Sequence, residues 1–199
     1  MPTIEHHLLT GAFIHEPKGA DTADDGKFYV ADGLGSGTWT YSPTGWGYYK
    51  DDASAQVVST SAVKLSIDGA GGTSESSYLP KDIRGTSELW DTTTDDITPV
   101  AVGDAYDIRL DLPVTAKSGA PALVTLQLDI GATEAASTVI VERDITTSKT
   151  PPYVISVGFP IFCGSTFLAN GGQFFLHTDT GTVDITKPAI AIVRNHGEI

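Results

Sequence analysis

The amino-acid sequence predicts an all-β fold, an antiparallel β-sandwich or jelly roll with an extended N-terminal arm. Apolar residues occupy every second position from Tyr106 to Val114, which is the period of a β-strand with one face in a core. The same alternation returns along most of the chain after Trp39. Helical periodicity is almost absent, so a parallel α/β fold, which needs helices between its strands, is excluded.

Residues 1–37 are expected to form the arm, and residues 38–199 the β jelly-roll domain. Apolar residues are sparse in the arm, so it buries too little apolar surface to fold alone. We expect one short strand in it, Lys27 to Val30, and a terminus without fixed structure is the alternative for the rest. Five apolar side chains of the arm are candidates for binding another surface: Ile4, Leu8, Leu9, Phe13 and Ile14.

Eight or nine strands, separated by turn-forming residues, are expected in the β domain. Residues 73–98 are the least regular part, interpreted as a long surface excursion with a helical turn at Ser87 to Trp90. The expected strands lie at residues 39–41, 46–49, 63–67, 106–114, 122–130, 138–145, 152–162, 173–178 and 182–194.

Length and charge narrow the class of protein. A chain of 199 residues is the size of one sizeable β domain. Its net charge of -13 and the absence of a Lys/Arg cluster argue against nucleic acid and acidic membranes as partners. No apolar stretch is long enough to cross a membrane, and the N-terminus lacks the pattern of a secretory signal. We therefore expect a soluble protein made in a cytoplasm.

No set of side chains in the sequence forms a convincing metal or cofactor site. His6, His7 and His15 fit no established zinc spacing and are interpreted as exposed arm residues. The acidic run 91–96 lacks the ligand spacing of a calcium loop. Cys163 lies in an apolar run and is expected to be a small buried residue. We expect no metal and no cofactor.

Catalytic chemistry has no better basis in the sequence. Asp107, Arg109 and Asp111 share one face of the strongest strand, and paired carboxylates can hydrolyse glycosides. The arginine between them favours a ladder of ion pairs over a general acid, because a neighbouring positive charge stabilises the ionised form of a carboxylate. We expect no enzyme, and a glycosidase or depolymerase is the least favoured function.

Two groups of aromatic residues are candidates for binding surfaces. The first group exceeds what one inward sheet face needs and is expected to include residues of a subunit interface. Its members are Phe159, Phe162, Phe167, Phe174 and Phe175, with His177 beside them. The second group could stack on sugar rings. The favoured alternative is that these residues lie in the core or at a subunit interface. It comprises Trp39, Trp46, Tyr48 and Tyr49.

Two parts of the sequence resemble virion proteins of tailed bacteriophages. His15 to Gly19, followed by Tyr29 to Trp39, is similar to segments of fibre and decoration proteins. Val102 to Arg109 and the closing Ala189 to Asn195 look like the trimeric jelly rolls of such proteins, which are themselves similar to the tumour necrosis factor fold.

The resemblance implies a homotrimeric jelly roll on the capsid surface of a virion, assembled in the host cytoplasm. As a capsid decoration or cement protein it would bind the major capsid protein where shell subunits meet and stabilise the shell. As a head or tail fibre protein it would recognise a glycan or receptor on the host surface. The sequence has no long coiled coil or repetitive shaft, which favours the decoration protein.

Overall fold

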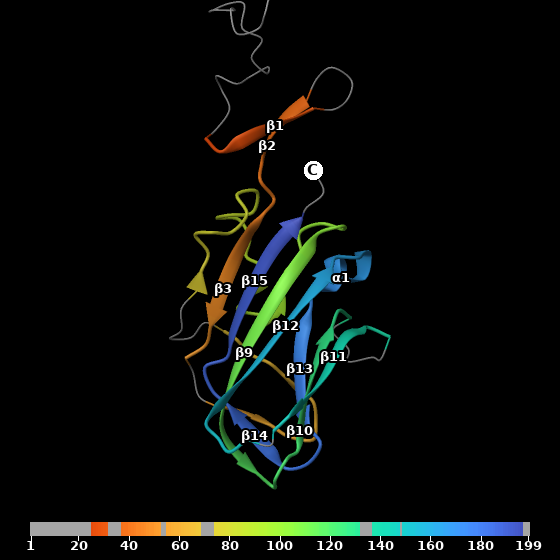
Figure 1. Ribbon diagram of the computed structural model, residues 1–199. Coiled ribbons are helices and arrows are strands. Elements are labelled where there is room, and N and C mark those ends of the chain that lie inside the picture. The colour runs from red at the N-terminus through yellow and green to blue at the C-terminus, as the bar shows by residue number, and fades with distance from the viewer. Residues whose placement is uncertain are drawn as a thin grey trace, which may run out of the picture. The chain divides into compact units, whose positions relative to one another are not determined.

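The computed structural model describes residues 25–31, 37–52, 55–68, 74–131, 137–147 and 149–196. The all-β prediction is confirmed, because these residues form antiparallel sheets and a single short helix (Figure 1). They divide into two compact units, residues 25–42 and residues 43–196. The helix, α1 (Ser165–Asn170), is far too short to span a lipid bilayer, and the described residues hold no other helix that could.

The first unit is a hairpin of β1 (Lys27–Ala31) and β2 (Gly37–Tyr41). Tyr29 lies directly opposite Trp39, and their ring centroids are 5.4 Å apart in an edge-to-face contact. The predicted strand at 27–30 is confirmed within β1. Residues 38–41 pair with β1 in this unit, so the compact units divide after Ser42, and the arm boundary at residue 37 stays a prediction.

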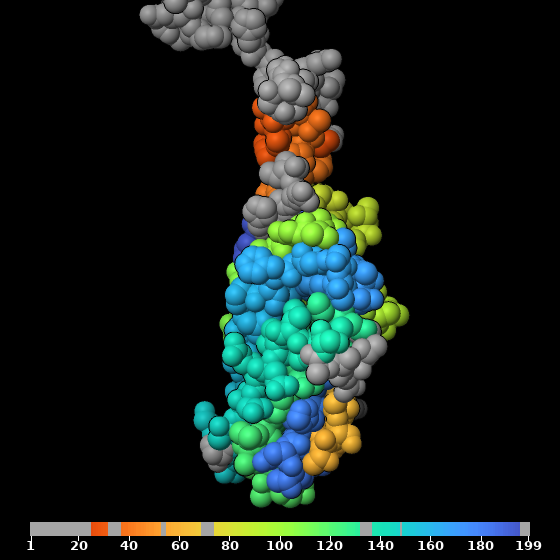
Figure 2. Space-filling model, turned by 90° about the vertical axis from the view of Figure 1, so that its right-hand side faces the viewer, coloured from red at the N-terminus to blue at the C-terminus, as the bar shows by residue number. Residues whose placement is uncertain are grey.

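The second unit, called the body below, contains a large sheet built around β9. The order of this sheet is β4-β14-β9-β15-β3-β6, and β12 pairs with the opposite edge of β9 from β15. Figure 1 shows β3, β15 and β9 side by side, and Figure 2 shows β4, in orange, beside β14, in blue. The strands are β3 (Gly45–Lys50), β4 (Gln56–Val58), β6 (Ser74–Glu75), β9 (Ala105–Ser118), β12 (Tyr153–Phe162), β14 (Thr182–Ile185) and β15 (Ala189–His196).

A smaller sheet of order β11-β10-β13-β5 forms the second layer of the body. The short strands β7 (Trp90–Asp91) and β8 (Asp96–Ile97) pair with each other, and Ile97 bridges to Gly172 just before β13. The remaining strands are β5 (Val63–Lys64), β10 (Leu123–Asp129), β11 (Val139–Thr146) and β13 (Gln173–Thr178).

The core lies between the two sheets and follows from the alternation in the sequence. The apolar residues of β9 from Tyr106 to Val114 are buried, as are Val124, Leu126 and Leu128 of β10. Rings from the two sheets meet at Phe159 of β12 and Phe174 of β13, 6.0 Å apart. A strand that buries every second residue can only pack one face, so the two sheets cover each other as a sandwich.

The irregular segment and the helix differ from expectation. The helical turn predicted at Ser87 to Trp90 is wrong, because the turn lies at residues 81–86 and Trp90 already begins β7. The helix α1 was not predicted, since six residues are too few for a periodic pattern to be recognised. It is anchored by Phe167, which is fully buried and packs edge-on against Tyr106 at 6.3 Å.

A buried ion pair fixes one end of the large sheet. Arg194 of β15 is 2% exposed, and its Nη2 donates to Oδ1 of Asp104, which is 0% exposed, over 3.2 Å. Its Nη1 donates to Oδ2 of Asp82 over 2.6 Å. Burial of the guanidinium acts to lower its pKa, but the hydrogen bonds and charges of the two carboxylates outweigh burial and raise the pKa. Arg194 therefore stays charged inside the protein.

The second carboxylate oxygen of Asp104, Oδ2, accepts two hydrogen bonds. The Tyr106 hydroxyl donates to Asp104 Oδ2 over 2.8 Å, and the backbone N–H of Ala101 donates to the same oxygen over 3.0 Å. The Tyr106 hydroxyl in turn accepts the N–H of Val100. Burial, together with Asp104, raises the pKa of Tyr106, so the phenol remains a donor. Arg194 Nε lies 3.0 Å from Asp104 Oδ2, within ion-pair distance but without the geometry of a hydrogen bond. The other polar groups named here each have a hydrogen-bond partner.

Removing one member of this network should be strongly destabilising. We expect Asp104→Ala to lower the free energy of unfolding by about 3–5 kcal/mol, because it leaves Arg194 charged and buried with fewer acceptors. Urea unfolding followed by tryptophan fluorescence measures the loss. The control is Asp111→Asn in the exposed Arg109–Asp111 pair, for which we expect less than about 1 kcal/mol. Similar losses in both variants would contradict a structural role for the buried pair.

Candidate functional site

The outer face of the large sheet, which points away from the core, is the candidate functional surface of the body. Phe162, at the end of β12, is 76% exposed, and Val154 near the start of the same strand is also exposed. On β3, the exposed Trp46 ring stacks on the Tyr78 ring with centroids 4.9 Å apart and planes inclined by 12°. Large apolar side chains therefore lie on β12 and on β3, on one face of the sheet.

Strand alternation places these residues outward. On β12, Ile155, Phe159 and Ile161 point into the core, so Val154 and Phe162 lie on the opposite face. In the described residues β12 pairs with β9 alone, which makes it an edge strand. The exposed Pro160 of β12 suits that position, because proline has no N–H to donate to a further strand.

The register across four strands defines the middle of this face. One cross-strand row runs from Gly158 of β12 through Arg109 and Ala191 to Tyr48 of β3. The adjacent row runs from Pro160 through Asp107 and Val193 to Trp46. The charged residues Arg109 and Asp107 and the small residues Ala191 and Val193 therefore lie between β12 and the aromatic residues of β3.

The charged residues of the outer face are paired with neighbours. Arg109 Nε lies 3.1 Å from Asp111 Oδ2, and the Ser156 hydroxyl donates to Asp111 Oδ1 over 2.6 Å. Asp107 accepts a hydrogen bond from the side chain of Asn195. The predicted pairing of Arg109 with a neighbouring carboxylate is confirmed at Asp111. This arrangement lowers the charge that an apolar partner would have to cover.

The residues predicted for a subunit interface separate into two classes. Phe159, Phe167 and Phe174 belong to the core of the single chain, and Phe175 of β13 is buried as well. His177 is half-buried on β13. Phe162 is the one member of that set with a largely exposed side chain. Phe159, Phe167 and Phe174 thus fill the space between the sheets, and Phe162 is the member of the set that is exposed enough to contact another copy.

The residues predicted to contact a glycan are also divided by the fold. Trp46 and Tyr48 share the outer face of β3, whereas Tyr49 points into the core and is buried. The Tyr49 hydroxyl donates to Glu88 Oε2 over 2.7 Å, and burial raises the pKa of this phenol. Trp39 belongs to the β1–β2 hairpin. Tyr78 was missed, because it lies in a segment without periodicity.

Other sequence candidates have structural roles or lie outside the described residues. Cys163 is buried, as expected, and burial with the charge of Asp104 raises the pKa of its thiol to about 11. Asp91 Oδ1 accepts hydrogen bonds from the backbone N–H groups of Thr93 and Thr94, so this carboxylate stabilises the turn that follows it. The described residues contain no cluster of His, Cys, Asp or Glu suited to a metal ion.

The candidate arm residues and the N-terminal histidines lie outside the described residues. They are Ile4, Leu8, Leu9, Phe13 and Ile14, and His6, His7 and His15.

Comparison with known proteins gives a weak result. No protein-family model matches the chain, and no curated protein matches it. Among solved structures, the Eiger TNF from S. frugiperda is 11% identical, covers 79% of this chain and 96% of its own, and has a TM-score of 0.47. The PRD1 vertex protein P5 is 12% identical, covers 88% of this chain and 85% of its own, and has a TM-score of 0.45. The fold class given above rests on the strands and sheets of this chain.

Proposed function

We propose that the protein is a virion structural protein, a homotrimeric decoration or cement protein that binds the major capsid protein of a bacteriophage. The observation on which the proposal rests is the outer face of the large sheet, with the exposed Phe162 and Val154 on the edge strand β12 and the exposed Trp46 on β3. The phage-like sequence stretches at 15–19 and 29–39 and in the C-terminal half supply the virion context.

The exposure of these side chains favours an interface. A single exposed apolar residue needs no explanation, but apolar residues gathered on one sheet face mark a surface that another protein covers. Aromatic residues are enriched in the buried centre of protein interfaces. Covering such a face with a partner removes its apolar area from water, which is favourable in proportion to that area.

The geometry fits a contact between copies of the chain. The apolar end of β12 lies at the edge of the large sheet, and Trp46, Tyr48 and Val193 lie on its face. In the proposed trimer, the Phe162 edge of one copy packs on the Trp46 face of the next. Such a contact joins two different patches, and three of them close into a ring around a threefold axis.

The N-terminal arm supplies the proposed contact with the shell. Its apolar residues Ile4, Leu8, Leu9, Phe13 and Ile14 would dock on the major capsid protein. Three arms on one trimer bind together, so weak single contacts are multiplied through the effective concentration of the second and third arms. Each trimer would then tie neighbouring shell subunits together at the capsid surface.

The trimer is tested by light scattering. We expect the full chain to elute with a molar mass of about 63 kDa, three times the 20.9 kDa of one chain. Phe162→Asp should shift the mass to that of one chain, because it places a charge in the apolar contact. The control, Ile140→Asp, changes an exposed apolar residue of β11 on the smaller sheet and should leave the trimer intact. A monomeric wild-type chain would refute the trimer.

The arm is tested by deleting residues 1–20. We expect the shortened chain to remain trimeric and to keep its circular dichroism spectrum, but to lose binding to purified capsids in a co-sedimentation assay. The body of the chain supplies all contacts of the proposed trimer, so the two properties separate. If the shortened chain co-sediments as well as the full chain, the arm does not bind the shell.

A second candidate function is a fibre protein that recognises a host glycan. The stacked pair of Trp46 and Tyr78 favours it, because an exposed aromatic plane can pack against the C–H face of a sugar. We expect glycan-array binding by the full chain that Trp46→Ala abolishes, with the Ile140→Asp variant as control. An array without signal, or an unchanged signal in Trp46→Ala, would exclude this site.

A further inference from the structure

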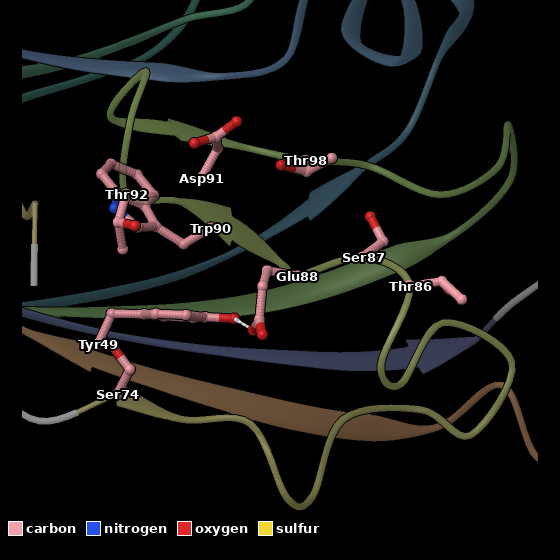
Figure 3. Close-up of a pocket in the computed structure, with 9 residues that line it drawn as sticks. All are labelled: Tyr49, Ser74, Thr86, Ser87, Glu88, Trp90, Asp91, Thr92 and Thr98. Carbon is pink, nitrogen blue, oxygen red and sulfur yellow. Dashed lines mark hydrogen bonds between the residues drawn. The ribbon is translucent and has the colours of Figure 1, made fainter.

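A pocket of about 470 Å³ lies in the body, on the opposite side of β3 from Trp46 and Tyr48. Its volume is within the range of pockets that hold small molecules. Four separate segments of the chain form its walls, so the pocket could not be predicted from a single sequence motif (Figure 3). The lining residues are Tyr49, Ser74, Thr86, Ser87, Glu88, Trp90, Asp91, Thr92 and Thr98.

Two buried aromatic residues hold the pocket in shape. Tyr49 donates to Glu88 and accepts the N–H of Leu89 over 3.1 Å, which ties β3 to the segment before β7. Trp90 donates from Nε1 to the carbonyl of Ile67 over 2.9 Å. The Trp90 ring also stacks near Phe174 of β13, with centroids 6.3 Å apart. The walls are therefore fixed by contacts that need no ligand.

The polar groups of the pocket are mainly hydroxyls. The side chains of Ser74, Ser87, Thr92 and Thr98 make no hydrogen bond to any residue that the structure describes. Figure 3 shows Ser87 pointing toward the side of the pocket on which Thr98 lies. Each free hydroxyl can donate one hydrogen bond and accept others. The pocket thus offers both kinds of hydrogen-bonding group around a preformed space.

The two carboxylates of the pocket, Asp91 and Glu88, differ in the hydrogen bonds that they already accept within the protein. Asp91 points away from Glu88 in Figure 3 and accepts the N–H groups of its own turn, which lowers its pKa. Glu88 is exposed and uses Oε2 for Tyr49. The lining contains no Lys, Arg or His. An anionic ligand would therefore meet two carboxylates and no positive charge.

We propose that this pocket binds a neutral polyhydroxylated ligand of the sugar class. Ligand hydroxyls would exchange hydrogen bonds with Ser87, Thr98 and Ser74 and donate to Glu88. Such a ligand matches a lining that both donates and accepts, whereas an apolar ligand would leave these groups without partners. The described residues of the pocket form no cluster suited to a metal ion, and an organic cation is distinguished from a neutral ligand by the probes given below.

The site is separate from the proposed trimer face and from the Trp46 site. Tyr49 was a candidate for stacking on a sugar together with Trp46, with a place in the core as the favoured alternative; β3 directs these two side chains to opposite sides of the sheet, and Tyr49 is buried. In the pocket, Tyr49 serves as a buried wall and as the support of Glu88. The inference therefore stands independently of the proposed virion function.

Saturation-transfer NMR on the full chain tests the inference. The probes are glucose, galactose, mannose and N-acetylglucosamine at millimolar concentration, with glucosamine and spermidine as cationic probes. We expect a signal from at least one neutral sugar. Thr98→Val removes one hydroxyl at nearly constant volume and should weaken binding roughly three- to tenfold, the effect of one lost hydrogen bond. Ser87→Trp fills the pocket and should abolish binding.

The controls separate ligand binding from folding and from assembly. Thr166→Val changes an exposed hydroxyl of α1 outside the pocket and should leave the sugar signal unchanged. All variants should keep the molar mass and melting temperature of the wild type. The inference is overturned if no neutral sugar gives a signal, if only glucosamine or spermidine binds, or if Ser87→Trp binds as well as the wild type.

Discussion

The ion pair between Arg194 and Asp104 is the constraint on which the body depends. It joins β15 to the turn before β9, and Asp82 adds the long segment between β6 and β7. These three residues lie far apart in the sequence, yet they meet around one guanidinium. β15 lies between β9 and β3 in the sheet, so β3 can pair only after the C-terminal strand is in place. Both ends of the body must therefore be present before the large sheet is complete.

The sequence predicted those parts of the fold that depend on neighbouring residues. The alternation from Tyr106 to Val114 identified β9, and the same period identified β10. The alternation did not predict that Arg194 pairs with Asp104, because a contact between residues 90 positions apart leaves no local pattern in the sequence. The phenylalanines were counted as a surplus for the same reason. One inward face does not need Phe167 and Phe174, but a core closed by a helix and a second sheet does.

The residues of the outer face and of the pocket were harder to predict from the sequence than the fold was. Alternation along β3 separates Trp46 and Tyr48 from Tyr49, which a list of exposed aromatics does not reveal. The outer face combines side chains of β12, β9, β15 and β3, and the register between those strands is set by the whole sheet. The pocket residues come largely from the irregular segment 74–98, where neither helical nor strand periodicity exists. Their proximity arises only from tertiary packing.

The proline in the edge strand β12 has a consequence for how copies of this chain can combine. An uninterrupted edge allows sheets of different molecules to fuse through their backbones, which leads to open-ended fibrils. Pro160 has no amide hydrogen to donate to a further strand, so this edge cannot form an unbroken ladder of backbone hydrogen bonds. Contact with another molecule at this margin is therefore left mainly to exposed side chains such as that of Phe162.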